Sequence, residues 1–211
     1  MSDAIAMQFV PPVSPEDQAR ANLYGLLARL FYAPPDAYLI SELRLAAPPP
    51  DEGGEALTAE GEALRVAWAA LAEACGSAFP ARLEEEHLQL FVGVGKSEVT
   101  PYLSAYLVRS ESDSPLARLR GQLAEWGLAR REEAVEPEDH VSALCETMRW
   151  LIVGRKADLH VQRHFFLEYL HTGGSRFCTA VSACDNARFY RYPARLLQAL
   201  LDVEHKAFEI D

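Results

Sequence analysis

Apolar residues recur along most of the chain at intervals of three and four positions, which places them on one face of an α-helix. The first such run follows Ser14 and Pro15, a pair typical of a helix start with proline at the first helical position. This helix is expected to end before Pro34, and its apolar positions are Ala19, Leu23, Leu26, Leu27 and Leu30. No stretch shows the sustained alternation that a half-buried strand requires, so the pattern predicts an all-α protein.

Further helices follow from the same pattern, and together they predict a bundle of about ten. A second Ser-Pro start, at Ser114, opens a helix that ends at Gly127. The clearest pattern runs from Pro137 to Val153, with apolar residues along one side. The other expected helices cover residues 36–45, 57–75, 80–94, 101–109, 158–171 and 189–208, with a shorter helix inside 172–186.

The length of 211 residues is enough to bury one core without disulfides or metal ions, so we expect a single domain over residues 1–211. Residues 1–13 are expected to be flexible. Residues 46–56, rich in proline and glycine, are expected to form a linker inside the domain. Most of the cysteines fall in apolar helical patterns without a CxxC pair, which predicts buried thiols: Cys75, Cys145, Cys178 and Cys184.

The charge balance is acidic, with 31 acidic against 20 basic side chains and a formal net charge of −11. Such a field repels phosphate backbones and anionic lipid, which argues against nucleic acid as a partner and favours a cationic peptide. Acidity that serves only solubility is the alternative. The N-terminal residues lack a basic region followed by a long apolar run, and no segment approaches the roughly 20 apolar residues of a membrane span. We therefore expect a cytoplasmic protein without stable membrane insertion.

Three patterns raise the alternative of a small helical metal- or nucleotide-dependent hydrolase. Gly95-Lys96-Ser97 matches the end of a phosphate-binding loop, but Leu90 stands where the leading glycine belongs. His160 and His164 are spaced to face one metal ion, but no third ligand follows at an obvious distance. Ser104 and His140 offer a nucleophile and a base, but no glycine elbow surrounds the serine. We predict no metal site and no catalytic residue.

The segment "VEPEDH", Val135 to His140, stands where the helix over residues 137–153 is expected to begin. Pro137 suits a first helical turn, and the neighbouring carboxylates would complement the positive end of the helix dipole. His140 falls at the margin of the apolar face, where a neutral imidazole can bridge buried and exposed groups. Carboxylates beside an apolar margin suit an arginine-bearing peptide with a hydrophobic tail.

Three motifs, taken in order, resemble the TorD/DmsD/NarJ family of cytoplasmic chaperones for molybdenum enzymes. They are "LFVG" at Leu90–Gly93, "PYLSAYL" at Pro101–Leu107 and "EPEDH" at Glu136–His140. A late "FYRYPARLLQALL" also resembles the last helix of that family. The resemblance spans the chain from about residue 83 to the C-terminus. It departs from many members in "YLHTGGSRF", where they carry a tryptophan and often a histidine.

The resemblance implies a TorD-like helical bundle without catalytic turnover and without a cofactor, apart from weak binding of guanine nucleotide in some members. It further implies binding to the twin-arginine leader and the apo form of a molybdopterin oxidoreductase catalytic subunit, which delays export until the cofactor is inserted. A monomer or a domain-swapped dimer is expected. The peptide groove would include Leu90, Phe91, Pro101, Tyr102, Ser104 and Tyr106, with a polar wall of Pro137, Glu138, Asp139 and His140. The two motifs are therefore expected to meet in space.

Overall fold

The computed structural model describes residues 13–46, 58–93, 97–107, 114–130 and 135–210. This described part consists of helices and turns with one isolated β-bridge, which confirms the all-α prediction. The expected flexible N-terminus and the linker at residues 46–56 lie almost entirely outside the described residues. The α-helices are α1 (Pro15–Tyr32), α2 (Ala37–Leu45), α3 (Ala59–Cys75), α4 (Pro80–His87), α5 (Ser104–Leu107), α6 (Pro115–Glu125), α7 (Val141–Arg149), α8 (Leu159–Phe165), α9 (Thr172–Ala183) and α10 (Arg191–Ile210).

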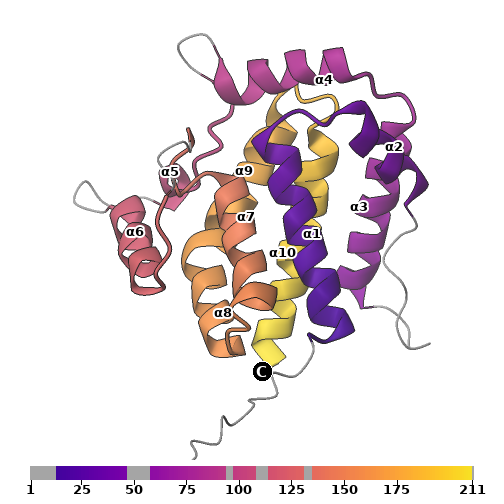
Figure 1. Ribbon diagram of the computed structural model, residues 1–211. Coiled ribbons are helices and arrows are strands. Elements are labelled where there is room, and N and C mark those ends of the chain that lie inside the picture. The colour runs from indigo at the N-terminus through magenta and orange to yellow at the C-terminus, as the bar shows by residue number, and fades with distance from the viewer. Residues whose placement is uncertain (1–12, 47–57, 94–96, 108–113, 131–134, 211) are drawn as a thin grey trace, which may run out of the picture.

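Three π-helical turns continue helices of the bundle. They are η1 (Leu88–Val92) after α4, η2 (Trp150–Gly154) after α7 and η3 (Phe166–His171) between α8 and α9. α1 packs against α7, and α10 packs against α3 and α9. Figure 1 shows α4 crossing one end of this bundle, while α6 stands at its side beyond the short α5.

Several helix ends lie where the sequence predicts them. The Ser14 hydroxyl accepts a hydrogen bond from the Asp17 amide at 3.0 Å, and α1 ends at Tyr32. This side-chain cap satisfies an amide that has no partner inside the helix. Gly127 follows α6 with a φ of 74°, a left-handed conformation that glycine adopts without strain.

Two helices begin later than predicted. α7 begins at Val141 rather than Pro137, and α5 begins at Ser104 rather than Pro101. The residues before both helices instead pair with each other through their backbones, as described below. The carboxylates of "EPEDH" therefore precede the helix, and their predicted place in its first turn is wrong.

The helical path through α8, η3 and α9 continues across Gly173 and Gly174, where the sequence predicted a break after His171. A Cβ atom at Gly173 would lie 3.1 Å from the Leu103 Cβ and 3.2 Å from the Leu103 carbonyl oxygen. A Cβ atom at Gly174 would lie 2.9 Å from a methyl carbon of Leu201. The two glycines thus permit close helix packing, and the first brings α9 against the "PYLSAYL" segment.

One polar network crosses the core. The Arg20 guanidinium donates to both oxygens of the Glu204 carboxylate, at 2.6 and 2.8 Å. It also donates to Gln162 at 3.1 Å, and the Tyr24 hydroxyl donates to Glu204 at 3.3 Å. Glu204 is 2% exposed, so its carboxylate is satisfied by these protein groups rather than by water. The network fixes α1 against α10 and α8.

Three of the four cysteines are buried as the pattern predicts, whereas the prediction for Cys184 is wrong. Cys75, Cys145 and Cys178 are buried, Cys184 is half-buried, and all four are free thiols. His87 lies at the edge of the core and is 7% exposed. Across the ranges described above, no helix combines the length and the apolar character that crossing a membrane demands.

Candidate functional site

The two motifs expected to meet do so at a short backbone junction. Tyr102 and His140 form an isolated antiparallel bridge. The Leu103 amide donates to the Asp139 carbonyl at 2.8 Å, and the Val141 amide donates to the Pro101 carbonyl at 2.9 Å. These bonds join "PYLSAYL" to "EPEDH" directly and confirm that the two segments lie side by side.

Side chains reinforce this junction. The Tyr102 hydroxyl donates to the Glu136 carboxylate at 2.7 Å, and the Ser104 hydroxyl donates to Asp139. Burial and the adjacent Glu136 carboxylate raise the pKa of Tyr102 to about 12. Asp139 is 3% exposed, and its second carboxylate oxygen has no hydrogen-bond partner in the described part of the chain. Asp139 is therefore nearly closed off from solvent, and one of its oxygens binds Ser104 of "PYLSAYL".

His140 is the N-cap of α7. Its Nδ1 accepts a hydrogen bond from the Ser142 amide at 3.2 Å and lies 2.7 Å from the Ser142 hydroxyl. The acceptor role requires an unprotonated Nδ1, so the Nε2–H tautomer is present. Burial lowers the pKa of His140 to about 4. The imidazole is neutral as predicted, but at 4% exposure it is buried rather than at the margin of the core.

Other predicted groove residues lie beneath the surface. Leu90 is fully buried, Phe91 is 6% exposed and Pro101 is buried. The Phe91 ring packs edge-on against Tyr190 at a centroid distance of 5.0 Å. The Tyr106 hydroxyl donates to the Thr100 carbonyl at 3.0 Å. Leu90 and Phe91 therefore lie in the core and Pro101 lies in the junction itself, so their predicted place in an open groove needs correction.

An open groove of about 870 Å³ lies beside the junction, between α1, α6 and α7. Glu136, Pro137 and Glu138 form one side of it, so the acidic motif borders a real cavity. Most of the other residues that line the groove have apolar or small side chains. The lining comprises Gly25, Ala28, Arg29, Tyr32, Arg120, Leu123, Ala124, Leu128, Ala129, Arg130, Val135, Glu136, Pro137, Glu138, Ser142, Ala143, Glu146, Thr147 and Trp150.

The sequence did not single out the contribution of α1 to this groove. Gly25 and Ala28 are three positions apart on one helix and present almost no side chain. A Cβ atom at Gly25 would lie 2.9 Å from the Arg149 Cδ, so the glycine leaves room for the Arg149 side chain of α7. Tyr32, 58% exposed, and Val135, 81% exposed, extend apolar surface at the groove. The signal in the sequence that could have indicated this surface was the pair of small residues Gly25 and Ala28, three positions apart on one helix.

The charges of the groove are mixed and partly paired. Glu138 forms an ion pair with Arg120 at 3.0 Å, and Glu146 forms one with Arg149 at 2.5 Å. Arg130 also lines the groove. A ligand would therefore meet an apolar floor between polar side chains, some of which already have partners. This suits an amphipathic peptide better than a purely cationic one.

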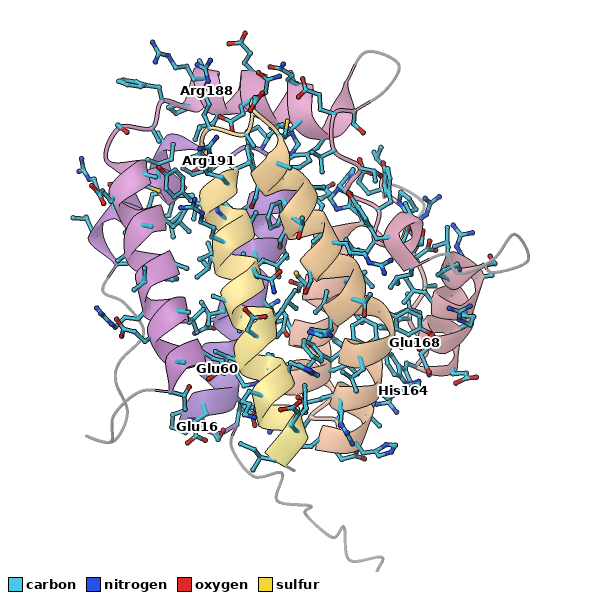
Figure 2. All side chains as sticks on the ribbon, turned by 180° about the vertical axis from the view of Figure 1, so that it is seen from behind. Glu16, Glu60, His164, Glu168, Arg188 and Arg191 are labelled. Atoms are coloured by element: carbon cyan, nitrogen blue, oxygen red, sulfur yellow. The ribbon has the colours of Figure 1, made fainter. Side chains whose placement is uncertain are left out.

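A second pocket, of about 580 Å³, lies between α4 and the start of α10. There the Glu86 carboxylate accepts hydrogen bonds from the Phe189 and Tyr190 amides, both at 2.8 Å to one oxygen. Arg188 borders this pocket, and Figure 2 shows Arg188 and Arg191 together at the end of the molecule away from Glu16. No residue of either motif of the junction lines this pocket.

The geometry does not support the hydrolase alternative. Ser104 bonds to Asp139, and the Nδ1 of His140 is engaged by Ser142, so Ser104 and His140 do not form the predicted nucleophile–base pair. His160 and His164 are both exposed on α8, and the described ranges hold no cluster of three residues able to bind a metal ion. The candidate phosphate loop at 95–97 lies mostly outside the described residues.

Comparison with known proteins places the chain in a family. The model of the nitrate reductase delta subunit matches residues 58–179, more than half of the chain. A chaperone protein TorD from Shewanella loihica is 28% identical over 209 residues, with 92% of this chain and 95% of the relative covered. A chaperone protein TorD from Photobacterium profundum is 29% identical over 126 residues, with 54% of this chain and 58% of the relative covered.

A solved structure supports the same fold. A redox enzyme maturation protein from Archaeoglobus fulgidus aligns with a TM-score of 0.52 at 18% identity, covering 94% of this chain and 99% of the other. The relatives named as chaperones agree with the prediction of a protein without catalytic turnover. The chain belongs to the TorD/NarJ family of chaperones.

Proposed function

We propose that this protein is a cytoplasmic chaperone dedicated to one molybdenum oxidoreductase. It binds the leader peptide and the apo form of the catalytic subunit, assists insertion of the cofactor and delays export until insertion is complete. The observation that carries the proposal is the groove of about 870 Å³ bordered by Glu136, Pro137 and Glu138, in a chain of this family. Leader binding needs no catalytic group, in agreement with the chaperone names of the relatives.

The chemistry of the groove suits a leader peptide. Leader peptides combine basic residues with an apolar stretch. The apolar floor from α1, α6 and α7 would take the apolar stretch, since burying it removes hydrophobic surface from water. Glu136 is the carboxylate of the groove wall that pairs with a tyrosine hydroxyl rather than with a cation, so it remains able to attract positive charge.

The predicted site residues divide into two roles under this proposal. Pro137 and Glu138 contact the client directly, as part of the wall of the groove. The remaining residues hold that wall in place from below and behind, through the backbone bridge, the Tyr102–Glu136 bond and the Ser104–Asp139 bond. These supporting residues are Leu90, Phe91, Pro101, Tyr102, Ser104, Tyr106, Asp139 and His140.

Residues 1–211 act as one domain, as a monomer or as a domain-swapped dimer, and the client is a protein rather than nucleic acid. The net charge of −11 agrees with a cationic leader as ligand, because it favours approach of positive charge.

Isothermal titration calorimetry of the full chain with the synthetic leader of a molybdoenzyme subunit tests the proposal. The affinity should fall with added salt, and Glu136→Gln combined with Glu138→Gln should weaken binding by about fivefold, since groove carboxylates are lost. Glu84→Gln, at an exposed position on α4, is the matched control and should leave the affinity unchanged. Absence of binding to the leader of every molybdoenzyme subunit encoded beside this protein would refute the proposal.

A further inference from the structure

Two tryptophans form an aromatic notch at one edge of the groove. Trp126 follows α6 and Trp150 begins η2, and their ring centroids lie 6.3 Å apart at an interplanar angle of 36°. Both side chains are half-buried. Trp150 also lines the groove, so the notch and the groove share a wall. Sequence periodicity did not single out either residue, since each falls near the end of a helical run.

The chain's own Arg155 occupies this notch. Its guanidinium carbon lies 5.4 Å from the Trp126 ring centroid and 5.9 Å from the Trp150 ring centroid. Both distances fall within the range of a cation–π contact, for which tryptophan is the best aromatic partner. The occupied notch shows directly that this pair of rings accepts a guanidinium group.

Arg155 is held there weakly. Its side chain is exposed, and within the ranges that the structure describes it forms no ion pair with a carboxylate. The rings, by contrast, are fixed. Trp126 packs on Phe165 at 5.8 Å, and Trp150 lies so close to Gly154 that a Cβ atom there would be 2.7 Å from the indole. A rigid receptor therefore holds a side chain that is free to leave.

Glu136 accepts a hydrogen bond from Tyr102 and has no cation partner among the described residues, but the other acidic residues nearby are already engaged. Asp139 is buried and bonded to Ser104. Glu138 is paired with Arg120, and Glu146 is paired with Arg149. An incoming arginine would have to break an existing ion pair to reach Glu138 or Glu146. At the notch it would instead replace another guanidinium, that of Arg155.

We propose that Trp126 and Trp150 bind the guanidinium of an arginine in a peptide held by the groove, and that Arg155 is an internal competitor which this arginine displaces. The inference rests on the proposed function and assigns the selective recognition of arginine to the tryptophans rather than to Glu138 or Asp139. The notch selects arginine over lysine, because a planar guanidinium stacks on both rings while an ammonium group does not.

Two peptides test this site against the full chain by calorimetry: a synthetic leader with two consecutive arginines before an apolar stretch, and the same peptide with lysines. Wild-type protein should bind the arginine peptide about three- to tenfold more tightly. Arg155→Ala should tighten binding of the arginine peptide by a similar factor, because the competitor is removed. Trp126→Leu should abolish the difference between the peptides. Arg163→Ala, an exposed arginine on α8, is the matched control and should behave as wild type.

Each outcome has a distinct meaning. Equal affinities for the two peptides in the wild type, or an arginine preference that survives both Arg155→Ala and Trp126→Leu unchanged, would overturn the notch while leaving the proposed function standing. Failure of every variant to bind either peptide would overturn both. Circular dichroism melting checks that Trp126→Leu is folded. Should it not fold, Arg155→Ala decides alone, since an exposed side chain is removed there.

Discussion

Acid should destabilise this protein through His140 more than through any exposed histidine. The imidazole is 4% exposed, and burial lowers its pKa from 6.5 to about 4. In the unfolded chain His140 takes up a proton near pH 6.5, while in the folded chain it stays neutral until about pH 4. The unfolded state therefore binds more protons between these values, and the free energy of unfolding falls as the pH falls through this window.

The size of the effect follows from the two pKa values. Integration of the linkage relation gives a loss of about 2 kcal/mol at pH 5 and about 3 kcal/mol at pH 4, relative to pH 7. The side chain is nearly closed to solvent, so screening by water reduces this contribution little. A loss of this size is a large fraction of the roughly 5–15 kcal/mol that stabilises an ordinary domain.

Urea unfolding followed by circular dichroism from pH 7 to pH 4 measures this loss. His140→Asn removes the titrating group, while asparagine still caps α7. Between pH 7 and pH 4, the free energy of unfolding of this variant should therefore fall by about 3 kcal/mol less than that of the wild type. His164→Asn, at an exposed position on α8, should retain the wild-type dependence. Parallel curves for wild type and His140→Asn would refute the reasoning, because the buried neutral imidazole would then make no contribution.

Three further substitutions, together with one control substitution, test the packing around the junction and the core, each by urea denaturation. Gly173→Ala should lower the free energy of unfolding by about 1 kcal/mol despite the better helix propensity of alanine, because the new Cβ would press on Leu103. Gly121→Ala is the control, because no atom lies within 4 Å of the position of its Cβ. This substitution should raise the free energy of unfolding by about 0.5–1 kcal/mol. Equal effects of the two would contradict the close approach. Glu204→Ala should lower the free energy of unfolding by about 3 kcal/mol, because Arg20 loses its bidentate partner in a largely buried site. An unchanged midpoint of urea denaturation would show that the Arg20–Glu204 pair contributes nothing to stability. Ser104→Ala should cost about 1.5–3 kcal/mol because the buried carboxylate of "EPEDH" loses its hydroxyl donor, and a neutral effect would rule out a supporting role for that bond.

Local signals in the sequence predicted the helices well. The Ser14-Pro15 start and the Gly127 end both depend on groups within one turn, and the structure places both as expected. The buried cysteines follow from helical periodicity in the same way. Such features are encoded by neighbours in the chain, so a pattern of spacing is sufficient to find them.

Features that depend on residues far apart in the sequence could not be predicted from patterns of spacing. The start of α7 shifts to Val141 because residues 101–103 capture the backbone that would otherwise form the first turn. The break predicted after His171 is absent because Gly173 serves close packing on Leu103 rather than a turn. Both outcomes depend on tertiary contacts, which override local propensity.

The site was predictable in part. The resemblance to the family correctly led us to expect the meeting of "PYLSAYL" and "EPEDH", which a bridge between Tyr102 and His140 makes. It did not identify the groove surface from α1, where Gly25 and Ala28 look like ordinary positions of an amphipathic helix. Nor did it separate the residues that border the cavity from those, such as Leu90, that support them from the core.

Hydrogen–deuterium exchange of the full chain, with and without a saturating synthetic leader peptide, tests the central claim most directly. If the leader binds in the groove, the peptide should slow exchange in the second half of α6 and in residues 135–147, while α4 and the start of α10 keep their rates. Slowed exchange confined to the pocket between α4 and α10, with no change beside the Tyr102–His140 bridge, would contradict it.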